Sequence, residues 1–364
     1  MESSQLQEQA PDKRKRIFIF ALVASLLLVL LVSGAFSFFV TPTTQEDFSQ
    51  DVDFTGEAPG LSPSPFPFRE MTIPALRERE YKSSLGEREL VSENANYTSY
   101  STSYDSDGSR VNAQLTVPKG EEPEGGFPAI IFIHGYIPPT LYQTFSNYSA
   151  YVDYLASNGF VVFKIDLRGH GDSEGEPSGA YYSENYVVDT RNAIAALEKS
   201  GFVNPFRIGL WGHSMAGNVV MRTVASKQDI PAVVIWAGAV YSYEDWQKYG
   251  IEDNSYRPPE TTSQRQSRRK ELFDTYGEFS SQSEFWRQVA PTNYLDGLKT
   301  AIQLNHAIDD DVVNIGYSRD LVKILEEKNI KNDLNEYSSG GHNISGNSFN
   351  QAMQNTVEFF RENL

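Results

Sequence analysis

Five short apolar runs, separated by segments with helical periodicity, constrain the fold of this chain more than any other feature. Runs that are apolar on both faces are typical of strands in a parallel sheet that is covered on both sides. The alternation of strand and helix therefore predicts an α/β fold with a mostly parallel, doubly wound sheet. The runs lie within 128–135, 160–175, 207–214, 232–240 and 301–309, and the helical segments are 145–158, 180–200, 215–226, 317–328 and 347–363.

Two further segments complete the predicted domain, which spans 81–364. Residues 97–104 and 110–117 alternate in polarity on either side of DSDG, which indicates an N-terminal antiparallel hairpin. Roughly sixty residues lie between Val240 and Ala301, too many for an ordinary connection. Their mixture of aromatic and polar residues predicts a helical cap insertion at about 242–295, laid over the strand ends. The alternative is an enlarged crossover that never reaches a site.

The first eighty residues predict a membrane anchor and a tether. The basic cluster KRKR at 13–16 precedes an uncharged apolar span at 17–40. As a helix this span would be about 36 Å long, enough to cross a hydrocarbon core of about 30 Å. The basic flank predicts a cytoplasmic N-terminus at 1–16 and an exported catalytic domain. Residues 41–80 are rich in Pro, Ser and acids and are expected to be an extended tether. Cleavage of the span as a signal peptide, with secretion of the rest, is the alternative.

Charge and cysteine content exclude several kinds of partner and chemistry. The formal net charge of −17 argues against nucleic acid, because binding a polyanion requires a basic surface. The chain has no cysteine, which excludes disulfides, thiolate metal sites and thiol nucleophiles. No pair of histidines has metal-ligand spacing, so no metal and no cofactor are expected.

The stretch IGLWGHSMAGN at 208–218 contains the candidate nucleophile. An apolar strand stops at Gly212, and Ser214 then lies between small residues at the start of a helical segment. A serine on such a strand-to-helix turn is held exposed above the sheet, and the positive helix N-terminus beside it stabilises a developing oxyanion. Ser214 is therefore the predicted catalytic nucleophile.

A serine nucleophile needs a base and an acid, which follow it in the order Ser, Asp or Glu, His. Only His306 and His342 follow Ser214 among the five histidines. His342 lies in the Gly-rich loop SSGGHNIS after the predicted last strand, where it could reach Ser214, and it is the predicted base. His170 and His213 are expected to be structural, His213 pointing away from the pocket beside Ser214. The acid follows the strand AIQLN, where the three consecutive residues Asp309, Asp310 and Asp311 cannot be distinguished by spacing.

These motifs, in this order, resemble the catalytic domain of the prolyl oligopeptidase family of α/β-hydrolases. The resemblance extends from about residue 97 to the end of the chain and rests on YDSDGSRVNAQLTVPKG, FPAIIFIHGY, DLRGHGDSEG, GHSMAG, DDDVV and GGHN. It implies that Asp310 is the acid, because the acid of such enzymes is usually followed three residues later by Val, as here by Val313. Ala216 stands where Gly is usual, one methyl group that the contact should tolerate. The tether and hairpin upstream leave no room for the family's β-propeller, so the resemblance implies hydrolytic chemistry without deciding between a peptide and an ester substrate.

The expected activity is that of a serine hydrolase that cleaves a small ester or a peptide through an acyl-enzyme. The backbone amides of Tyr136 and Met215 are expected to form the oxyanion hole. The DLRGHGDSEG loop is expected to be structural. The alternative from another class is a non-catalytic binding module that retains the α/β-hydrolase fold.

Overall fold

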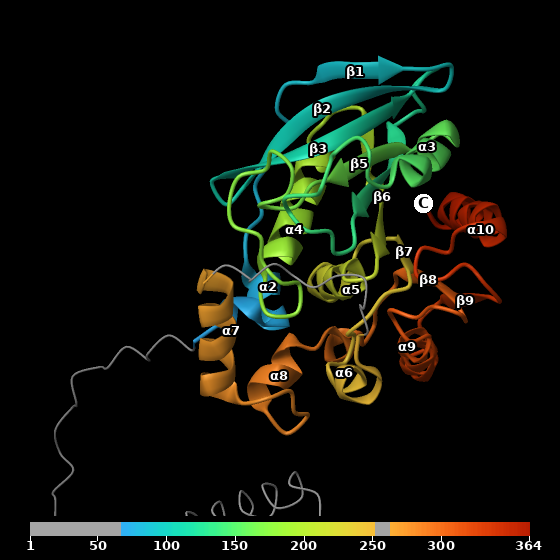
Figure 1. The fold of residues 1–364 in the computed structure, drawn as a ribbon. Helices are drawn as coiled ribbons and strands as arrows, with labels where there is room; N and C mark the ends of the chain where they lie inside the picture. The colour runs from blue at the N-terminus through green and yellow to red at the C-terminus, as the bar shows by residue number, and fades with distance from the viewer. Residues whose placement is uncertain (1–66, 252–262) are drawn as a thin grey trace, which may run out of the picture. The chain divides into compact units, whose positions relative to one another are not determined.

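The computed structural model describes residues 67–251 and 263–364, and within them a mixed nine-stranded sheet forms the centre of the domain (Figure 1). The strand order is β1-β2-β3-β5-β4-β6-β7-β8-β9. The strands from β5 to β9 in this order run parallel, whereas β1, β2 and β3 pair antiparallel. The strands are β1 Glu89–Glu93, β2 Tyr97–Ser106, β3 Ser109–Pro118, β4 Phe127–Ile133, β5 Val161–Ile165, β6 Val203–His213, β7 Ala232–Trp236, β8 Ala301–Ala307 and β9 Asn332–Tyr337.

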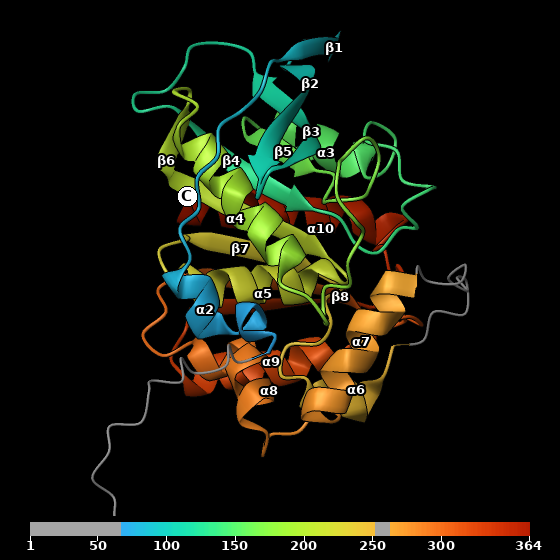
Figure 2. The same cartoon turned by 90° about the vertical axis from the view of Figure 1, so that its left-hand side faces the viewer.

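Helices cover both faces of this sheet. Figure 2 looks onto the face that α4, α5 and α9 cover, and α3 and α10 lie on the opposite face. The predicted α/β-hydrolase fold with a doubly wound sheet and an N-terminal hairpin is thus confirmed. The helices are α2 Ile73–Glu78, α3 Ser149–Ser157, α4 Asn185–Glu198, α5 Ala216–Ser226, α6 Glu244–Tyr249, α7 Ser263–Tyr276, α8 Glu284–Val289, α9 Gly316–Glu327 and α10 Asn347–Asn363, with short 3₁₀ turns η2 Arg69–Met71 and η3 Pro291–Tyr294.

The apolar runs form the sheet because successive side chains point to opposite faces and both faces are buried. In β4, Ile131 belongs to the core on the α4–α5 side, whereas its neighbours Ile130 and Phe132 belong to the core on the α3–α10 side. In β6, Leu210 and Trp211 divide in the same way. Parallel strands then bring their carboxyl ends to one edge, where ligand sites of open α/β sheets lie.

The N-terminal boundary of the folded domain differs from the sequence prediction. Residues 69–78 form η2 and α2, so the tether predicted for 41–80 ends earlier than expected. Met71, Ile73 and Leu76 are buried in the core. The guanidinium of Arg222, on α5, donates a hydrogen bond of 2.6 Å to the carbonyl of Met71. Thr72 caps the first turn of α2, a local start signal that the charged and Pro-rich composition of this region masks.

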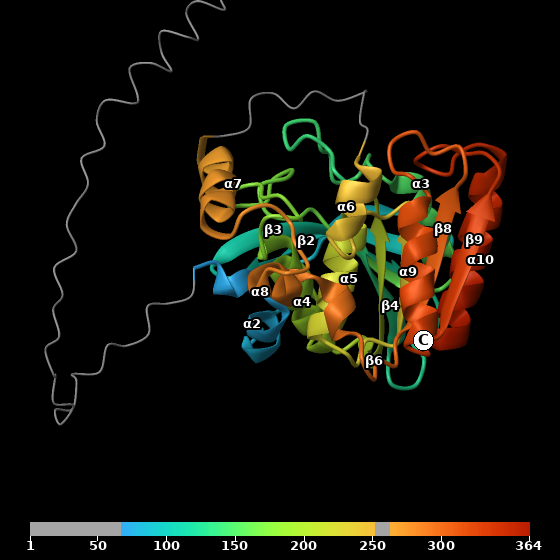
Figure 3. The same ribbon diagram turned by 90° about the horizontal axis from the view of Figure 1, so that it is seen from below.

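The insertion predicted for about 242–295 is helical, but its helices do not all lie over the strand ends. In Figure 3, α6 lies beside α9, whereas α8 lies beside α2. Lys248 and Tyr249 of α6 hydrogen bond to Asp320 in the first half of α9. The carbonyl of Tyr294 in η3 accepts hydrogen bonds from Arg77 and Gln228, near the end of α5 that is remote from the strand carboxyl ends. Among the described residues of the insertion, α6 therefore lies beside the first half of α9, whereas η3 lies near the opposite end of α5.

The predicted membrane span at 17–40 lies outside the described residues. Within 67–251 and 263–364, the helices are too short or too polar to cross a bilayer.

Candidate active site

Ser214 lies at the turn between β6 and α5. Its backbone φ is 55°, a left-handed conformation that is uncommon for a residue with a side chain and that marks functional turns. The Ser214 amide donates a hydrogen bond of 2.9 Å to the carbonyl of Trp236 in β7, and the amide of Gly217 donates one of 2.9 Å to the carbonyl of Ser214. These two bonds fix the strained turn between the sheet and the helix.

Glycines at the turn allow strand and helix to approach closely. A Cβ at Gly212 would lie 2.7 Å from Val220 Cγ2 and 3.2 Å from the Cβ of Ala216. A Cβ at Gly217 would lie 2.8 Å from the Cα of Gly238. The methyl group of Ala216 is fully buried at this contact, so the turn accommodates the residue that departs from the usual Gly.

The carboxylate of Asp310 is the one of the three consecutive aspartates that hydrogen bonds to His342. Its Oδ2 lies 2.9 Å from His342 Nδ1, and its side chain is shielded from solvent. The Oδ1 atom accepts hydrogen bonds of 2.9 Å from the amides of Val312 and Val313. Burial of the Asp310 carboxyl disfavours its charge, but hydrogen bonds from His306 and His342 outweigh burial and hold its pKa below the usual range. The carboxylate is therefore ionised and aimed at the imidazole.

The neighbouring aspartates have other surroundings. Asp309 accepts hydrogen bonds from the amides of Gly340 (3.2 Å) and Gly341 (2.8 Å), in the loop that carries His342. Asp311 is exposed. His306, which could follow Ser214 as a base, is instead fully buried, and its Nδ1 and Nε2 contact Ser318 Oγ (2.8 Å) and the carbonyl of Val313 (2.9 Å).

The loop after β9 presents His342 at the carboxyl edge of the sheet. Gly340 and Gly341 have φ values of 141° and 59°, which side chains rarely tolerate, so the loop needs both glycines. The hydroxyl of Tyr151, on α3, donates a hydrogen bond of 2.8 Å to the carbonyl of Asn343. The imidazoles of His342 and His213 lie 4.7 Å apart between ring centroids, so His342 adjoins the turn that carries Ser214.

The candidate oxyanion donors occupy two segments of the same edge. Met215 is the N-cap of α5, and the first amides of a helix have no intrahelical acceptor. Tyr136 follows β4 in a loop that is anchored at Gly135, whose amide donates a hydrogen bond of 3.0 Å to Tyr148 Oη.

A buried polar cluster that the sequence analysis missed supports the loop between β4 and α3. The ammonium group of Lys164, on β5, donates hydrogen bonds to the carbonyls of Thr144 and Asn147. The carboxylate of Asp166 accepts hydrogen bonds from the hydroxyls of Tyr142 (2.8 Å) and Thr144 (2.6 Å). Burial lowers the pKa of Lys164 to about 8 and raises that of Asp166 to about 6. The only hint in the sequence is a Lys within an otherwise apolar strand.

The DLRGHGDSEG loop is fastened by a buried ion pair. The guanidinium of Arg168 lies 2.6 Å from Asp189 Oδ1 on α4, and the Arg168 amide donates to the same carboxylate at 3.0 Å. These contacts are those of a structural loop.

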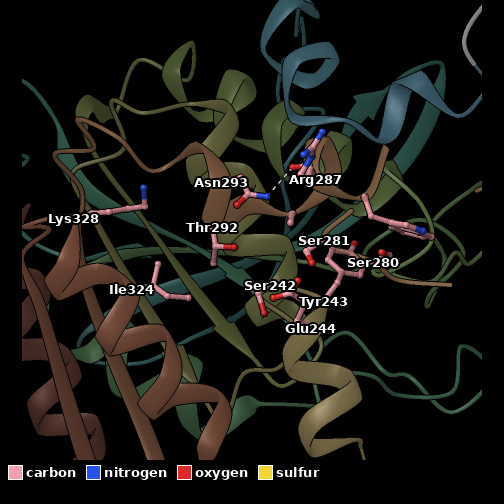
Figure 4. Close-up of a pocket in the computed structure, with 12 residues that line it drawn as sticks. Ser242, Tyr243, Glu244, Ser280, Ser281, Arg287, Thr292, Asn293, Ile324 and Lys328 are labelled. Atoms are coloured by element: carbon pink, nitrogen blue, oxygen red, sulfur yellow. Dashed lines mark hydrogen bonds between the residues drawn. The ribbon is translucent and has the colours of Figure 1, made fainter. Parts of the chain in front are cut away.

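A cavity of about 390 Å³ lies apart from these residues, between the insertion and α9 (Figure 4). Ser214, Asp310 and His342 are not among its lining residues, and neither are Tyr136 and Met215. The candidate site is therefore defined by Ser214, Asp310 and His342 at the strand ends and not by this cavity. In the described parts of the chain, no cluster of His, Asp and Glu has the geometry of a metal site.

Comparison with known proteins finds similar sequences and similar folds. The family described as serine aminopeptidase, S33, matches residues 128–254, which include Ser214. An uncharacterized protein, YfhR, of Salmonella typhi is 31% identical over 32% of this chain and 37% of its own length. The chain thus spans well under half of the curated relatives that it matches.

Solved structures share the fold over most of the chain. Acetyl xylan esterase 1 from Thermoanaerobacterium sp. JW/SL YS485 superposes with a TM-score of 0.55 and 20% identity, covering 82% of this chain and 96% of the esterase. The acylaminoacyl peptidase of Pyrococcus horikoshii gives 0.56 and 19%, covering 74% and 42%. The family match over residues 128–254 and the shared architecture show that the described domain has the α/β-hydrolase fold.

Proposed function

We propose that this protein cleaves an ester or peptide bond through a Ser-His-Asp triad and an acyl-enzyme. Ser214 Oγ attacks the carbonyl carbon of the substrate while His342 Nε2 accepts the hydroxyl proton. The same imidazole then gives that proton to the leaving alcohol or amine. Water releases the acyl group in a second round, with His342 again as the base. Asp310 holds the imidazole in the tautomer whose Nε2 can accept a proton.

One observation carries this proposal: the 2.9 Å hydrogen bond between Asp310 and His342, at the edge of the sheet where Ser214 occupies a left-handed turn. A buried, ionised carboxylate on Nδ1 has two effects. It leaves Nε2 as the basic nitrogen, and it stabilises the imidazolium that forms during the reaction. A binding module that retained only the fold would have no need of this pair.

The amides of Tyr136 and Met215 are the proposed oxyanion donors. A carbonyl carbon bound to Ser214 Oγ carries its oxygen close to the amide of the next residue, Met215. The amide of Tyr136, in the loop after the adjacent strand β4, is the proposed second donor. Loss of one such donor typically lowers kcat by about 10²- to 10³-fold.

Both substrate classes remain in the proposal, because the related structures include an acetyl xylan esterase and an acylaminoacyl peptidase. Hydrolysis of p-nitrophenyl acetate and of an aminoacyl p-nitroanilide by the same preparation distinguishes them. For an esterase, kcat/KM for the acetate ester divided by kcat/KM for the anilide should lie well above the same ratio of the two compounds' uncatalysed hydrolysis rates.

Labelling with a fluorophosphonate tests the nucleophile. The full chain in detergent should be labelled, and Ser214→Ala should remove the label without lowering the melting temperature. A folded wild-type protein that is neither labelled nor active on either substrate would overturn the proposed function.

We also propose that residues 17–40 anchor the catalytic domain outside the cytoplasm. The uncharged span and the preceding KRKR cluster support this. The chain should remain with membranes after alkaline washing, and a reporter fused after Leu364 should be active only outside the cytoplasm. Recovery of a mature protein that begins near Phe36 would instead indicate a cleaved signal peptide.

A further inference from the structure

Three segments of the proposed active site meet at the side chains of His213 and Tyr148. Tyr148 Oη lies 3.0 Å from the amide of Gly135 and 2.7 Å from His213 Nδ1. On the other side of the ring, His213 Nε2 lies 2.9 Å from the carbonyl oxygen of His342. Gly135 precedes Tyr136, His213 precedes Ser214, and His342 is the proposed base. One chain of hydrogen bonds therefore joins the loop after β4 that contains Tyr136, the turn that carries Ser214 and the loop that carries His342.

The partners of this chain determine where each proton lies. The amide of Gly135 can only donate, so Tyr148 Oη accepts from it. The carbonyl of His342 can only accept, so His213 carries its proton on Nε2. The remaining nitrogen, Nδ1, then accepts the hydroxyl proton of Tyr148. Each donor in this chain then has one acceptor. This pairing requires a neutral His213 with its proton on Nε2, a tautomer that we assign from the hydrogen-bond partners.

Burial keeps His213 in this neutral form. Burial first, and the adjacent imidazole of His342 second, lower the pKa of His213 to about 3. At neutral pH the ring is therefore a fixed hydrogen-bonding group and does not exchange protons with His342.

Packing leaves this arrangement little freedom. A Cβ at Gly135 would lie 2.9 Å from His213 Nδ1 and 2.9 Å from Tyr148 Oη, so this position has no room for a side chain. The ring of Tyr148 packs edge-on against Phe132 and Trp211, at centroid distances of 5.4 Å and 6.0 Å. Aromatic packing thus fixes the Tyr148 hydroxyl, which joins the loop after β4 to His213.

We propose that His213 and Tyr148 are positioning residues that set the relative placement of Ser214, His342 and the amide of Tyr136. This inference rests on the proposed function. Neither side chain takes part in the reaction itself. Their effect arises because a misplacement of about 1 Å between reacting groups can lower a rate by about 10²-fold. They hold together three segments that are far apart in the sequence.

Tyr148→Phe is the minimal test, since it removes one hydroxyl and keeps the ring. The matched control is Tyr154→Phe, the same change further along α3. Acylation and deacylation of the full chain in detergent are measured with p-nitrophenyl acetate by burst kinetics, and melting temperature is measured in parallel. We expect Tyr148→Phe to lower both rate constants by tenfold or more with KM changed less than threefold. Tyr154→Phe should stay within twofold of wild type.

A second pair of variants decides the matter if Tyr148→Phe does not fold. His213→Gln retains one acceptor and one donor on a planar group, whereas His213→Phe retains neither. The proposal requires His213→Gln to be at least tenfold more active than His213→Phe at equal melting temperature. It is overturned if these two variants have equal activity, or if a folded Tyr148→Phe matches Tyr154→Phe. The failure of the proposed function would differ, because the wild-type protein itself would then be inactive.

Discussion

Replacing Asp310 by Asn should cripple catalysis while leaving the fold intact, for reasons that the hydrogen bonds of this carboxylate define. Its Oδ1 accepts from the amides of Val312 and Val313, so the oxygen of the new side chain must stay there. The new NH₂ group then points toward His342 Nδ1, where it can only donate. Nδ1 must become the acceptor, and the proton of His342 moves to Nε2. The imidazole can no longer accept a proton from Ser214.

The magnitude follows from this change of tautomer. The same replacement in a Ser-His-Asp triad lowers kcat by about 10⁴-fold, which corresponds to about 5.4 kcal/mol in the activation free energy. Stability should fall much less, because the two backbone hydrogen bonds remain. The lost contacts of Oδ2 with His306 and His342 should reduce the free energy of unfolding by about 1.5–3 kcal/mol.

Initial rates with p-nitrophenyl acetate and a thermal melt measure both effects on the same preparation. The adjacent aspartates provide controls on the same turn. Asp311→Asn changes an exposed side chain and should retain at least half of wild-type kcat. Asp309→Asn keeps an oxygen for the amide of Gly341 and should cost less than tenfold. The reasoning is refuted if Asp310→Asn keeps more than a tenth of wild-type kcat, or if Asp309→Asn is the crippling change.

Three further expectations concern stability. Leu76→Ala should lower the free energy of unfolding, measured with urea, by about 2–5 kcal/mol, because Leu76 is buried. Leu90→Ala, at an exposed strand position, should change it by less than about 0.5 kcal/mol. Equal effects of the two substitutions would place Leu76 outside the core. Between pH 6.5 and about 3, His213 is protonated in the unfolded protein but neutral in the folded protein. Through this residue, the free energy of unfolding should therefore fall by up to about 1.4 kcal/mol for each unit by which the pH is lowered. His213→Gln should reduce that slope, and an unchanged slope would show that His213 is not held neutral. Gly238→Ala would place a Cβ 2.2 Å from Tyr241 Oη, so it should cost about 1–3 kcal/mol or more by calorimetry, and a neutral effect would contradict the tight packing at this turn.

Much of the fold could be predicted because its strands are buried on both faces. Strand β7, for example, is apolar and buried at each of its positions (AVVIW), and it lies within the predicted run 232–240. Strand β1 was missed because all five of its residues are exposed at the sheet edge, so it has no apolar period. The segment containing η2 and α2 was missed because its few apolar residues are separated by charged ones and become buried only when the segment packs against α5 and α8.

The site was harder to predict because its contacts join distant residues. The sequence order suggested Ser214 and His342, but three adjacent aspartates differ only in where the folded turn points them. His213 was expected to be structural and to point away from the pocket. In the structure its side chain is buried, and it contacts the carbonyl of His342, which lies 129 residues away. No local pattern could have revealed the link through Tyr148.

The turn that holds Asp310 specifies its own geometry within a short piece of chain. Four donors surround the carboxylate of Asp310. Three of them lie within four residues of it in the sequence: the amides of Val312 and Val313 and the imidazole of His306. Asp310, the proposed acid, therefore keeps its orientation without help from the insertion or the N-terminal hairpin. In evolutionary terms, residues around the proposed site can therefore diverge, and with them the preferred substrate, while Asp310 keeps its position. Directed evolution of this protein toward a new substrate should accordingly tolerate wide variation in the insertion and very little between residues 306 and 313.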